Sequence, residues 1–476
     1  MKNKLFIQKA YIDGEFISSK DTFEIINPST NNSIGSLPNL TVEDCKNAIK
    51  SANEAWLSWK KVSTGERCSI VKKIYELTLE YKNELAEIMT LESGKPLSES
   101  LGEVEYGNAF VEWFAEEGKR AYGETIPSLN GNTRISTIKQ GVGVVAAITP
   151  WNFPLAMISR KLAPALVAGC TMVLKPASQT PFTAIALAKI CEMAGLPKGV
   201  FSVITSKDSK AIGKELATNP LIRKLTFTGS TEVGSTLMAQ ASETVKRVSF
   251  ELGGNAPFIV FDDSNIDEAV KGAVAGKFRN AGQTCVSINR FIVQSSIYEE
   301  FAKKLTLAVK KLKVADGFTE GSQVGPLINA SAVDKVKRHI EDAVHNGAHI
   351  ATGGKVLKGN FFEPTVLTDV PNHSLIQIEE TFGPICALFR FDTEEEAITQ
   401  ANDTPFGLAA YFYSENIRRC QRVGEALEAG MVGINTGLIS NASAPFGGIK
   451  QSGIGREGSK YGLDEYMEIK YLCNAI

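Results

Sequence analysis

Between residues 143 and 261, short apolar runs of strand length alternate with stretches of helical pattern. The runs are continuous rather than alternating, which predicts strands that are buried on both faces. They lie at residues 144–148, 171–175, 201–204, 225–228 and 248–251. Helices are expected between them, one from about residue 155 to 167 and one from Pro181 toward Met193, where Gly195 and Pro197 end the pattern. This alternation predicts a parallel sheet covered by helices on both faces.

The segments on either side of this region carry different patterns. An apolar run at residues 257–261 begins a second α/β region that extends to about residue 440, and residues 41–118 are strongly helical in pattern. Residues 133–140 alternate polar and apolar side chains, which predicts an antiparallel strand in a ribbon. Because an isolated ribbon buries too little surface to be stable, we expect it to pack against another element or another subunit.

Length and composition limit the classes of protein to which the chain can belong. A chain of 476 residues is too long for one ordinary hydrophobic core, so two or three domains are expected. Its 43% apolar residues, 22% charged residues and formal charge of −2 are typical of a soluble protein and give no reason to expect nucleic acid or a membrane as partner. No apolar run reaches the roughly 20 residues that span a bilayer, and the N-terminus lacks the apolar core of a secretory signal. A cytoplasmic location is therefore expected.

The eight cysteines are scattered and form no C-x-x-C pair, which gives no indication of a zinc site or a thioredoxin-like redox pair. Scattered thiols fit a reducing compartment. All four histidines lie between residues 339 and 373, away from the cysteine motifs, which weakens the hypothesis of a Cys-His hydrolase. The H-E-x-x-H, G-x-S-x-G and phosphate-loop motifs do not occur in the sequence. No bound metal ion is predicted.

Three side chains in separate segments have the chemistry that covalent oxidation of an aldehyde requires. Cys285 supplies a thiol that can attack a carbonyl, Asn152 an amide that can stabilise an oxyanion, and Glu251 a carboxylate that can activate water. Each has a simpler interpretation: an inert buried thiol, a turn residue that satisfies its own backbone, and a paired carboxylate at the end of a strand. For Cys285, the small or polar residues 282–284 argue against an apolar core position.

Three glycine patterns resemble nucleotide-binding loops, and only one has a suitable context. Residues 453–458 match G-x-G-x-x-G but have no βαβ unit after them, and residues 141–146 precede their strand instead of following it. Both are interpreted as turns. At residues 227–234 a strand runs into the start of a helix, so backbone N–H groups there could face a pyrophosphate.

Two residues near the end of the strand at 171–175 bear on the choice of coenzyme. Ligands bind at the carboxyl ends of parallel strands, so the amine of Lys175 could hold a ribose hydroxyl or a phosphate. An acidic residue in the following loop would bind the ribose of NAD and repel the 2′-phosphate of NADP, whereas Ser178 is neutral and can donate. NADP is therefore favoured, with NAD as the alternative coenzyme. The simpler interpretations are a solvated lysine and an ordinary loop serine.

Together these motifs resemble the aldehyde dehydrogenase superfamily, and the resemblance covers nearly the whole chain. The most specific matches are Pro150-Trp151-Asn152-Phe153-Pro154, Phe227-Thr228-Gly229-Ser230, Glu251-Leu252-Gly253-Gly254, Gly282-Gln283-Thr284-Cys285, Glu379-Glu380-Thr381-Phe382-Gly383-Pro384 and Pro445-Phe446-Gly447-Gly448. By this resemblance Cys285 is the nucleophile, Glu251 the general base and Asn152 the oxyanion donor. The residues that it assigns to the coenzyme are Trp151, Lys175, Ser178, Gly229, Ser230, Leu252, Glu380 and Phe382.

The resemblance also implies a fold class and an assembly. The expected class is α/β with an aldehyde dehydrogenase-like fold, in which residues 1–122 and 144–253 form a Rossmann-type cofactor domain. Residues 254–445 would form an α/β catalytic domain, and residues 123–143 with 446–476 a β-ribbon oligomerisation arm. The resemblance implies a homodimer or a homotetramer.

Within the superfamily, the chain is most similar to the succinate-semialdehyde dehydrogenases, and residues 157–161, 175–181 and 438–441 carry this similarity. Such a substrate has a carboxylate opposite its aldehyde. Arg160 and Arg279 could clamp that carboxylate, with a hydrogen bond from Ser440. The alternative is that each arginine pairs with a structural carboxylate. Another short acid-semialdehyde such as glutarate semialdehyde, or a general aldehyde, is the alternative substrate.

Three rival functions stay open at this point. An acylating dehydrogenase would pass a thioester to coenzyme A, a thiol hydrolase would need no coenzyme, and a scaffold protein would have no activity. Glu251 disfavours the acylating dehydrogenase, because it equips the site to activate water. The presence of Cys285, Asn152 and Glu251 together disfavours the inactive scaffold. Some relatives carry a second cysteine two residues after the nucleophile. Here that position is Ser287, so no regulatory disulfide is expected.

Overall fold

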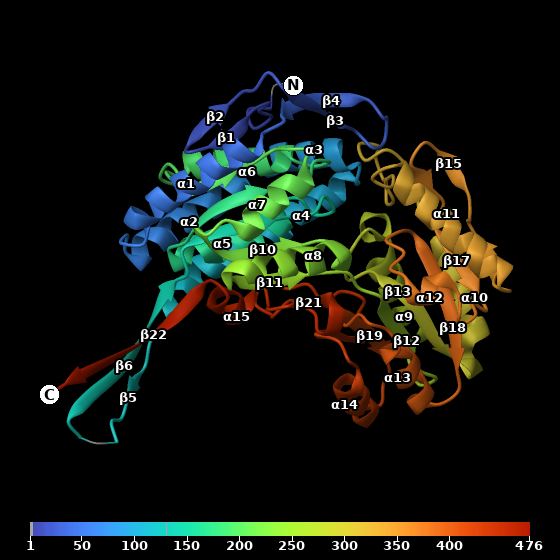
Figure 1. The fold of residues 1–476 in the computed structure, drawn as a ribbon. Helices are drawn as coiled ribbons and strands as arrows, with labels where there is room; N and C mark the ends of the chain where they lie inside the picture. Colours follow the sequence, from blue (N-terminus) through green and yellow to red (C-terminus); the bar gives the residue numbers. More distant parts are fainter. Residues whose placement is uncertain (1–2, 130) are drawn as a thin grey trace.

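The structure is a computed structural model that describes residues 3–129 and 131–476. Figure 1 shows two α/β regions side by side and an arm that projects from the first of them. Each region is built on its own sheet, so the two predicted α/β regions are both present.

The first region contains an eight-stranded sheet in the order β2-β1-β9-β8-β7-β10-β11-β21. Its strands are β1 (Ala10–Ile12), β2 (Glu15–Ile17), β7 (Val144–Ile148), β8 (Thr171–Lys175), β9 (Phe201–Val203), β10 (Ile222–Thr228), β11 (Arg247–Glu251) and β21 (Gly453–Ile454). Strands β7 to β11 are parallel to one another, which confirms the predicted parallel sheet. Antiparallel strands β1, β2 and β21 extend it at its two edges.

The strand order reverses beside β7. From β7 the chain continues through β8 and β9 on one side, and then crosses to β10 and β11 on the other. In a doubly wound sheet, ligands bind outside the carboxyl ends of the strands at such a reversal. The crevice is therefore expected between the loops that follow β7 and β10.

Helices cover both faces of this sheet, as predicted (Figure 1). They are α1 (Val42–Trp59), α2 (Thr64–Glu80), α3 (Lys82–Ser93), α4 (Leu97–Glu117), α5 (Ala156–Ala168), α6 (Phe182–Met193), α7 (Ser209–Thr218) and α8 (Thr231–Ala241). Helix α1 begins at a capping box formed by Thr41 and Asp44, and α2 at one formed by Ser63 and Glu66. The apolar faces of α2 to α6 meet in one buried cluster, and those of α1, α7 and α8 in a second.

The second region contains a seven-stranded sheet in the order β14-β17-β18-β13-β12-β19-β20. Its strands are β12 (Ala256–Val260), β13 (Ile288–Gln294), β14 (His349–Thr352), β17 (Thr365–Thr368), β18 (Ile385–Phe391), β19 (Ala409–Tyr413) and β20 (Met431–Ile434). Its helices are α9 (Ile266–Phe278), α10 (Tyr298–Val309), α11 (Ala330–His345), α12 (Leu375–Ile378), α13 (Glu394–Asn402) and α14 (Ile417–Ala426). The sheet is parallel except at β14, which pairs antiparallel with β17. Two small hairpins lie outside the main sheets, β3 (Thr22–Ile26) with β4 (Ser33–Pro38), and β15 (Val356–Lys358) with β16 (Phe361–Phe362).

The predicted ribbon is the projecting arm in Figure 1. Its strands are β5 (Thr125–Ile126), β6 (Thr133–Gly141) and β22 (Met467–Ala475), and β22 pairs antiparallel with β6 over its whole length. Residues 446–466, which the predicted boundary placed in the arm, lie elsewhere. Strand β21 pairs with the end of β11, and α15 (Ser459–Asp464) packs on α4 and α5, because these residues extend the first sheet and its helical layer. No helix in the described ranges is long and apolar enough to cross a membrane.

Candidate active site

The carboxyl ends of four neighbouring strands meet along one edge of the first sheet. In register, Ile148 of β7 lies opposite Lys175 of β8 and Phe227 of β10, and Thr228 of β10 lies opposite Glu251 of β11. The sequence motifs assigned to catalysis and coenzyme binding in the first region all follow directly from these ends. Parallel pairing thus brings together segments that are far apart in the sequence.

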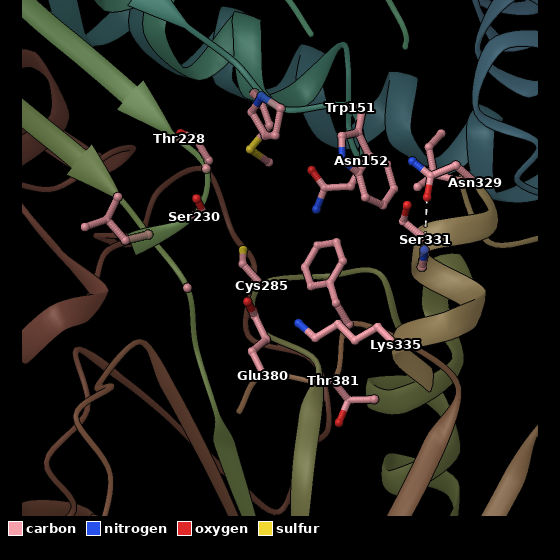
Figure 2. A pocket seen from close by; sticks show the side chains of 18 residues that line it. Trp151, Asn152, Thr228, Ser230, Cys285, Asn329, Ser331, Lys335, Glu380 and Thr381 are labelled. Atoms are coloured by element: carbon pink, nitrogen blue, oxygen red, sulfur yellow. Dashed lines mark hydrogen bonds between the residues drawn. The ribbon is translucent and has the colours of Figure 1, made fainter. Parts of the chain in front are cut away.

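A cavity of about 370 Å³ opens at this edge, between the two regions (Figure 2). The first region lines it with Pro150, Trp151, Asn152, Met157, Thr228, Gly229, Ser230, Leu252 and Gly253. The second region lines it with Cys285, Ile328, Asn329, Ser331, Ala332, Lys335, Glu380, Thr381 and Phe382. The rings of Trp151 and Phe382 meet edge to face across it, with centroids 5.5 Å apart. Both regions therefore contribute to a single site.

Cys285 follows a turn of left-handed residues. Asn280, Ala281 and Gly282 have φ angles of 50°, 55° and 77°, which reverse the chain sharply after α9. Both carboxylate oxygens of Glu99 on α4 accept from the N–H of Asn280, at 3.0 and 2.9 Å. A Cβ at position 282 would lie 2.3 Å from the carbonyl oxygen of Gly383, so only glycine fits there. The turn is thus fixed from two sides, and Cys285 projects into the cavity (Figure 2).

The Cys285 thiol is half-buried, and its surroundings favour the protonated form. Burial raises its pKa to about 12. The positive charge of Arg160 acts in the opposite direction, whereas the carboxyl groups of Glu251 and Glu380 raise the pKa further. In this structure the protonated thiol is therefore favoured. It must lose its proton, to a base or after a change of surroundings, before it can attack a carbonyl.

Asn152 is held rigidly beside the nucleophile. Its Nδ2 donates to the carbonyl oxygen of Gln283 at 3.0 Å, and its Oδ1 accepts from the N–H of Phe153 at 3.1 Å. Its own carbonyl oxygen accepts from Nζ of Lys95 at 2.6 Å and from Nδ2 of Asn280 at 3.0 Å. This network ties the loop after β7 to the turn before Cys285, and it leaves the amide on the cavity wall.

Glu251 ends β11 and is 3% exposed. It does not line the cavity, and its Oε2 has no hydrogen-bond partner within the described part of the chain. Burial and the neighbouring carboxylate of Glu457 raise the pKa of Glu251 well above its usual range, against the charges of Arg160 and Lys161. A buried carboxyl oxygen without a partner has capacity to accept from a water molecule.

Six of the eight residues assigned to a coenzyme line the cavity, and Lys175 and Ser178 lie outside it, at the end of the adjacent strand β8. Lys175 is 3% exposed, and its Nζ donates to the carbonyl oxygen of Pro176 at 3.2 Å. Burial lowers its pKa to about 8. The same loop is joined to the cavity wall by Thr180, whose hydroxyl donates to the carbonyl oxygen of Trp151 at 3.3 Å.

The cavity wall of the second region also contains Asn329, Ser331 and Lys335, which were not predicted from the sequence (Figure 2). Asn329 caps α11, accepting from the N–H of Ala332 at 3.0 Å, and Lys335 lies six residues further along the helix. The charge of Lys335 lowers the pKa of Glu380, but burial dominates and raises it to about 7. From the sequence, Asn329 could have been recognised as a helix cap. A capping asparagine marks the start of a helix, but it does not indicate a ligand.

The three residues predicted for the substrate carboxylate lie outside the lining of this cavity. Arg160 is buried and pairs with a carboxylate, its Nε lying 2.8 Å from Oε2 of Glu457, as in the simpler interpretation. Arg279 is half-buried against the ring of Phe153, 4.5 Å from its centroid, and makes no ion pair within 4.0 Å among the described residues. Ser440 lies partly exposed in the loop that follows β20.

The arrangement combines a thiol in a cavity, an amide fixed beside it, and a buried carboxyl group behind the wall. These are the components of covalent acyl transfer through sulfur, with a hydrogen-bond donor for an oxyanion and a base for water. In the described ranges, no group of three or more His, Cys, Asp or Glu side chains is placed to hold a metal ion.

Comparison with known proteins gives consistent matches over the full chain. Residues 16–472 match the aldehyde dehydrogenase family. The chain is 55% identical to succinate-semialdehyde dehydrogenase [NADP(+)] GabD of Escherichia coli, over 99% of this chain and 98% of that protein. It is 54% identical to glutarate-semialdehyde dehydrogenase of Pseudomonas putida, over 99% of each. The crystal structure of succinate-semialdehyde dehydrogenase from Burkholderia pseudomallei superposes with a TM-score of 0.99 at 55% identity, covering 100% of both chains.

Proposed function

The chain belongs to the aldehyde dehydrogenase family, and on this premise we propose that it oxidises succinate semialdehyde to succinate with NADP as the coenzyme. The observation that carries the proposal is the position of Cys285, in a cavity that opens at the carboxyl edge of a doubly wound sheet. A relative of 55% identity that is named for this substrate and this coenzyme supports the finer choice.

In the proposed reaction, the thiolate of Cys285 attacks the aldehyde carbon and forms a thiohemiacetal. Nδ2 of Asn152 and a backbone N–H stabilise the oxyanion, a contribution of about 10²–10³ in rate per donor. Oxidation of the thiohemiacetal leaves a thioester on Cys285. Glu251 then takes a proton from water, and the resulting hydroxide releases succinate and restores the thiol. The unpartnered Oε2 of Glu251 can accept from water, and burial raises the pKa of this carboxyl group, which makes its carboxylate a stronger base than an exposed one.

The residues at the carboxyl edge fit a nicotinamide dinucleotide. The amine of Lys175 is buried without a carboxylate within 4.0 Å in the described part of the chain, which leaves it able to bind an anion or a ribose hydroxyl. Helix α8 starts at Ser230 beside the cavity, where its free N–H groups favour a phosphate. When bound, the coenzyme supplies the acceptor for the hydride of the aldehyde. Trp151, Leu252, Glu380 and Phe382 would hold it from the two walls, and Lys335 is added to the residues predicted earlier.

The substrate carboxylate is assigned to Arg160, Arg279 and Ser440. Arg279 supports this assignment most directly, because it is half-buried, near the Cys285 turn, and without an ion-pair partner among the described residues. Glutarate semialdehyde is the second candidate substrate, since a relative of 54% identity is named for it. One additional methylene is worth only about 1–3 kcal/mol of discrimination, so a clamp for a carboxylate can accept both.

The rival functions are disfavoured by particular residues. Transfer of the thioester to coenzyme A needs no base for water, and the buried carboxyl group of Glu251 supports hydrolysis instead. A thiol hydrolase without a coenzyme would have no use for the nucleotide features of Ser230 and Lys175. A catalytically inactive scaffold would not need an accessible thiol beside a fixed amide.

We further propose that the protein acts as a homodimer or homotetramer in the cytoplasm. The arm supports assembly, because Ile469 and Tyr471 of β22 are 70% and 60% exposed on the projecting ribbon. Exposed apolar ribbons of this kind are stabilised by a partner. All eight cysteines are unpaired, which fits a reducing compartment.

A steady-state panel tests the proposed function. Succinate semialdehyde, glutarate semialdehyde and butanal are each offered with NADP and with NAD, and reduced coenzyme is followed by absorbance. We expect the highest kcat/KM for succinate semialdehyde with NADP. Equal kcat/KM for butanal would contradict the carboxylate assignment, and no coenzyme reduction with any aldehyde would contradict the function.

A further inference from the structure

Tyr106, on α4, contacts both arginines that are assigned to the substrate carboxylate. Nη1 of Arg160 donates to the hydroxyl of Tyr106 at 3.3 Å, and the guanidinium carbon of Arg279 lies 5.3 Å from the centre of the Tyr106 ring. Arg160 comes from α5 and Arg279 from the turn after α9, so the two cations belong to different regions of the fold. Tyr106 is the side chain that joins them.

Arg160 shares its carboxylate partner with a neighbouring lysine. Its partner Glu457 also pairs with Lys161, so that one carboxylate faces two cations. Burial and the carboxylate of Glu457 raise the pKa of Glu251, the next carboxyl group. The sulfur of Met157, which lines the cavity, accepts from Nη2 of Arg160 at 3.0 Å. The guanidinium of Arg160, which shares its partner carboxylate with Lys161, therefore lies one side chain behind the cavity wall.

Arg279 is positioned by aromatic rings rather than by a carboxylate. Its guanidinium carbon lies 4.5 Å from the centre of the Phe153 ring, so that Phe153 and Tyr106 both contact this group. Such cation–π contacts hold a guanidinium in place while leaving its N–H donors free. The donors are therefore available to a carboxylate that enters the site.

The position of Tyr106 is fixed by the packing of α4 on α5. The next residue is Gly107, and a Cβ there would lie 3.0 Å from the Cα of Ala156 on α5. The absence of a side chain at this point lets the two helices approach closely. The ring of Tyr106 also meets that of Phe110 edge to face, with centroids 5.2 Å apart. The close packing of α4 on α5 thus places the Tyr106 hydroxyl beside Arg160.

A guanidinium can only donate, so the oxygen of Tyr106 accepts the bond from Arg160 and its own hydrogen is free. No second partner of this hydroxyl occurs among the residues that the structure describes. We propose that Tyr106 determines specificity for the acid end of the substrate. Its hydroxyl donates to the substrate carboxylate, and its contacts with Arg160 and Arg279 set the spacing of the two guanidinium groups. This inference rests on the proposed function.

The substitution Tyr106→Phe tests it, because the ring and its contact with Arg279 stay while the hydroxyl is lost. We expect KM for succinate semialdehyde to rise about tenfold, as a hydrogen bond to a charged group is removed. The kcat for this substrate should change less than about twofold, and kcat/KM for butanal should stay constant, because neither depends on the carboxylate. A merely structural role would affect both aldehydes alike.

The matched control is Tyr75→Phe, which removes a hydroxyl from a half-buried tyrosine on α2. It should leave both substrates unaffected, and thermal melting checks that each variant is folded. Tyr106→Leu, which also removes the ring, should raise KM further. If the unmodified protein prefers succinate semialdehyde to butanal but Tyr106→Phe leaves KM unchanged, or lowers kcat/KM equally for both, the inference is wrong. If the unmodified protein shows no such preference, the proposed substrate falls as well.

Discussion

At the scale of single residues, the charges around Cys285 govern when it can react. Burial dominates the pKa of its thiol, and the nearest charges oppose one another, with Arg160 favouring the thiolate and Glu251 and Glu380 disfavouring it. A thiol protected in this way resists oxidation and alkylation until a substrate and coenzyme change its surroundings.

The reactivity of the free protein should therefore keep rising with pH. Because the pKa of Cys285 is raised to about 12, the thiolate fraction is small at neutral pH and should grow about tenfold per pH unit between 7 and 9. The rate of inactivation by iodoacetamide measures this fraction, and Cys285→Ala shows the background from the other cysteines. A plateau of the rate below pH 9 would mean that the thiol is already ionised in the free protein.

Arg279, which has no ion-pair partner among the described residues, allows a second test. Arg279→Ala removes a cation from the proposed carboxylate site, and kcat/KM for succinate semialdehyde should fall about 10- to 100-fold, corresponding to about 1.5–3 kcal/mol. For butanal the loss should be small. Steady-state kinetics with both aldehydes measure the difference, and equal losses would show that Arg279 supports the fold of the site rather than the substrate.

The sequence predicted part of this site and not the rest, for a physical reason. Cys285 and Asn152 lie in local motifs, and the structure brings both to one cavity, although their roles stay predictions. Asn329 and Lys335 reach the same cavity from α11, and nothing in their local sequence distinguishes them from a cap and a solvated lysine. The ion pair of Arg160 with Glu457 joins residues nearly 300 positions apart, which no local pattern encodes.

At the scale of elements, the turn between α9 and Cys285 connects backbone geometry to chemistry. Gly282 has a φ of 77°, and a Cβ there would lie 2.3 Å from the carbonyl oxygen of Gly383, in the loop that carries Phe382. Gly195 offers a matched comparison, since its φ is 82° but no atom lies within 4 Å of the position of its Cβ.

Gly282→Ala should therefore cost more than Gly195→Ala. Both substitutions carry the strain of a left-handed alanine, about 1–3 kcal/mol, whereas only the first adds a collision with backbone atoms and displaces Cys285. Thermal melting should show the larger loss for Gly282→Ala, and kcat should fall in that variant alone. Equal melting temperatures and activities for the two variants would contradict the close contact at Gly282.

The elements that the sequence predicted best are the long or buried ones. The strands β7, β8 and β12 and the helices α5 and α6 lie within one or two residues of their predicted ranges, because continuous apolar runs and proline or glycine ends mark them. Strands β1, β2 and β21 were not predicted. They are two or three residues long and form only because an edge of the first sheet offers partners from distant segments.

At the scale of the whole molecule, the projecting arm exposes apolar side chains to solvent. Side chains alternate across a strand, so Ile469 and Tyr471 share one face of β22 and Lys470 lies on the other. The side chains of Ile469 and Tyr471 are 70% and 60% exposed, whereas most apolar side chains on the strands of the two main sheets are buried. An interface between copies of the chain would cover this face.

The double substitution Ile469→Glu and Tyr471→Glu should reduce the size of the assembly. Placing two carboxylates in an interface carries a desolvation cost without a paired cation. Sedimentation velocity should show a smaller species than for the unmodified protein, while Lys470→Glu, on the opposite face, should change the mass little. A monomeric unmodified protein, or an unchanged mass in the double variant, would contradict the role assigned to the arm.

In the proposed mechanism, Cys285 becomes acylated and Glu251 activates the water that releases the acid. In the Glu251→Gln variant, incubated with succinate semialdehyde and NADP, we expect a burst of reduced coenzyme followed by slow turnover, and a succinyl group on the peptide that contains Cys285. Peptide mapping by mass spectrometry distinguishes this thiol from the other seven cysteines. Three results would contradict this mechanism: a burst without an adduct at Cys285, an adduct only at another cysteine, or no burst.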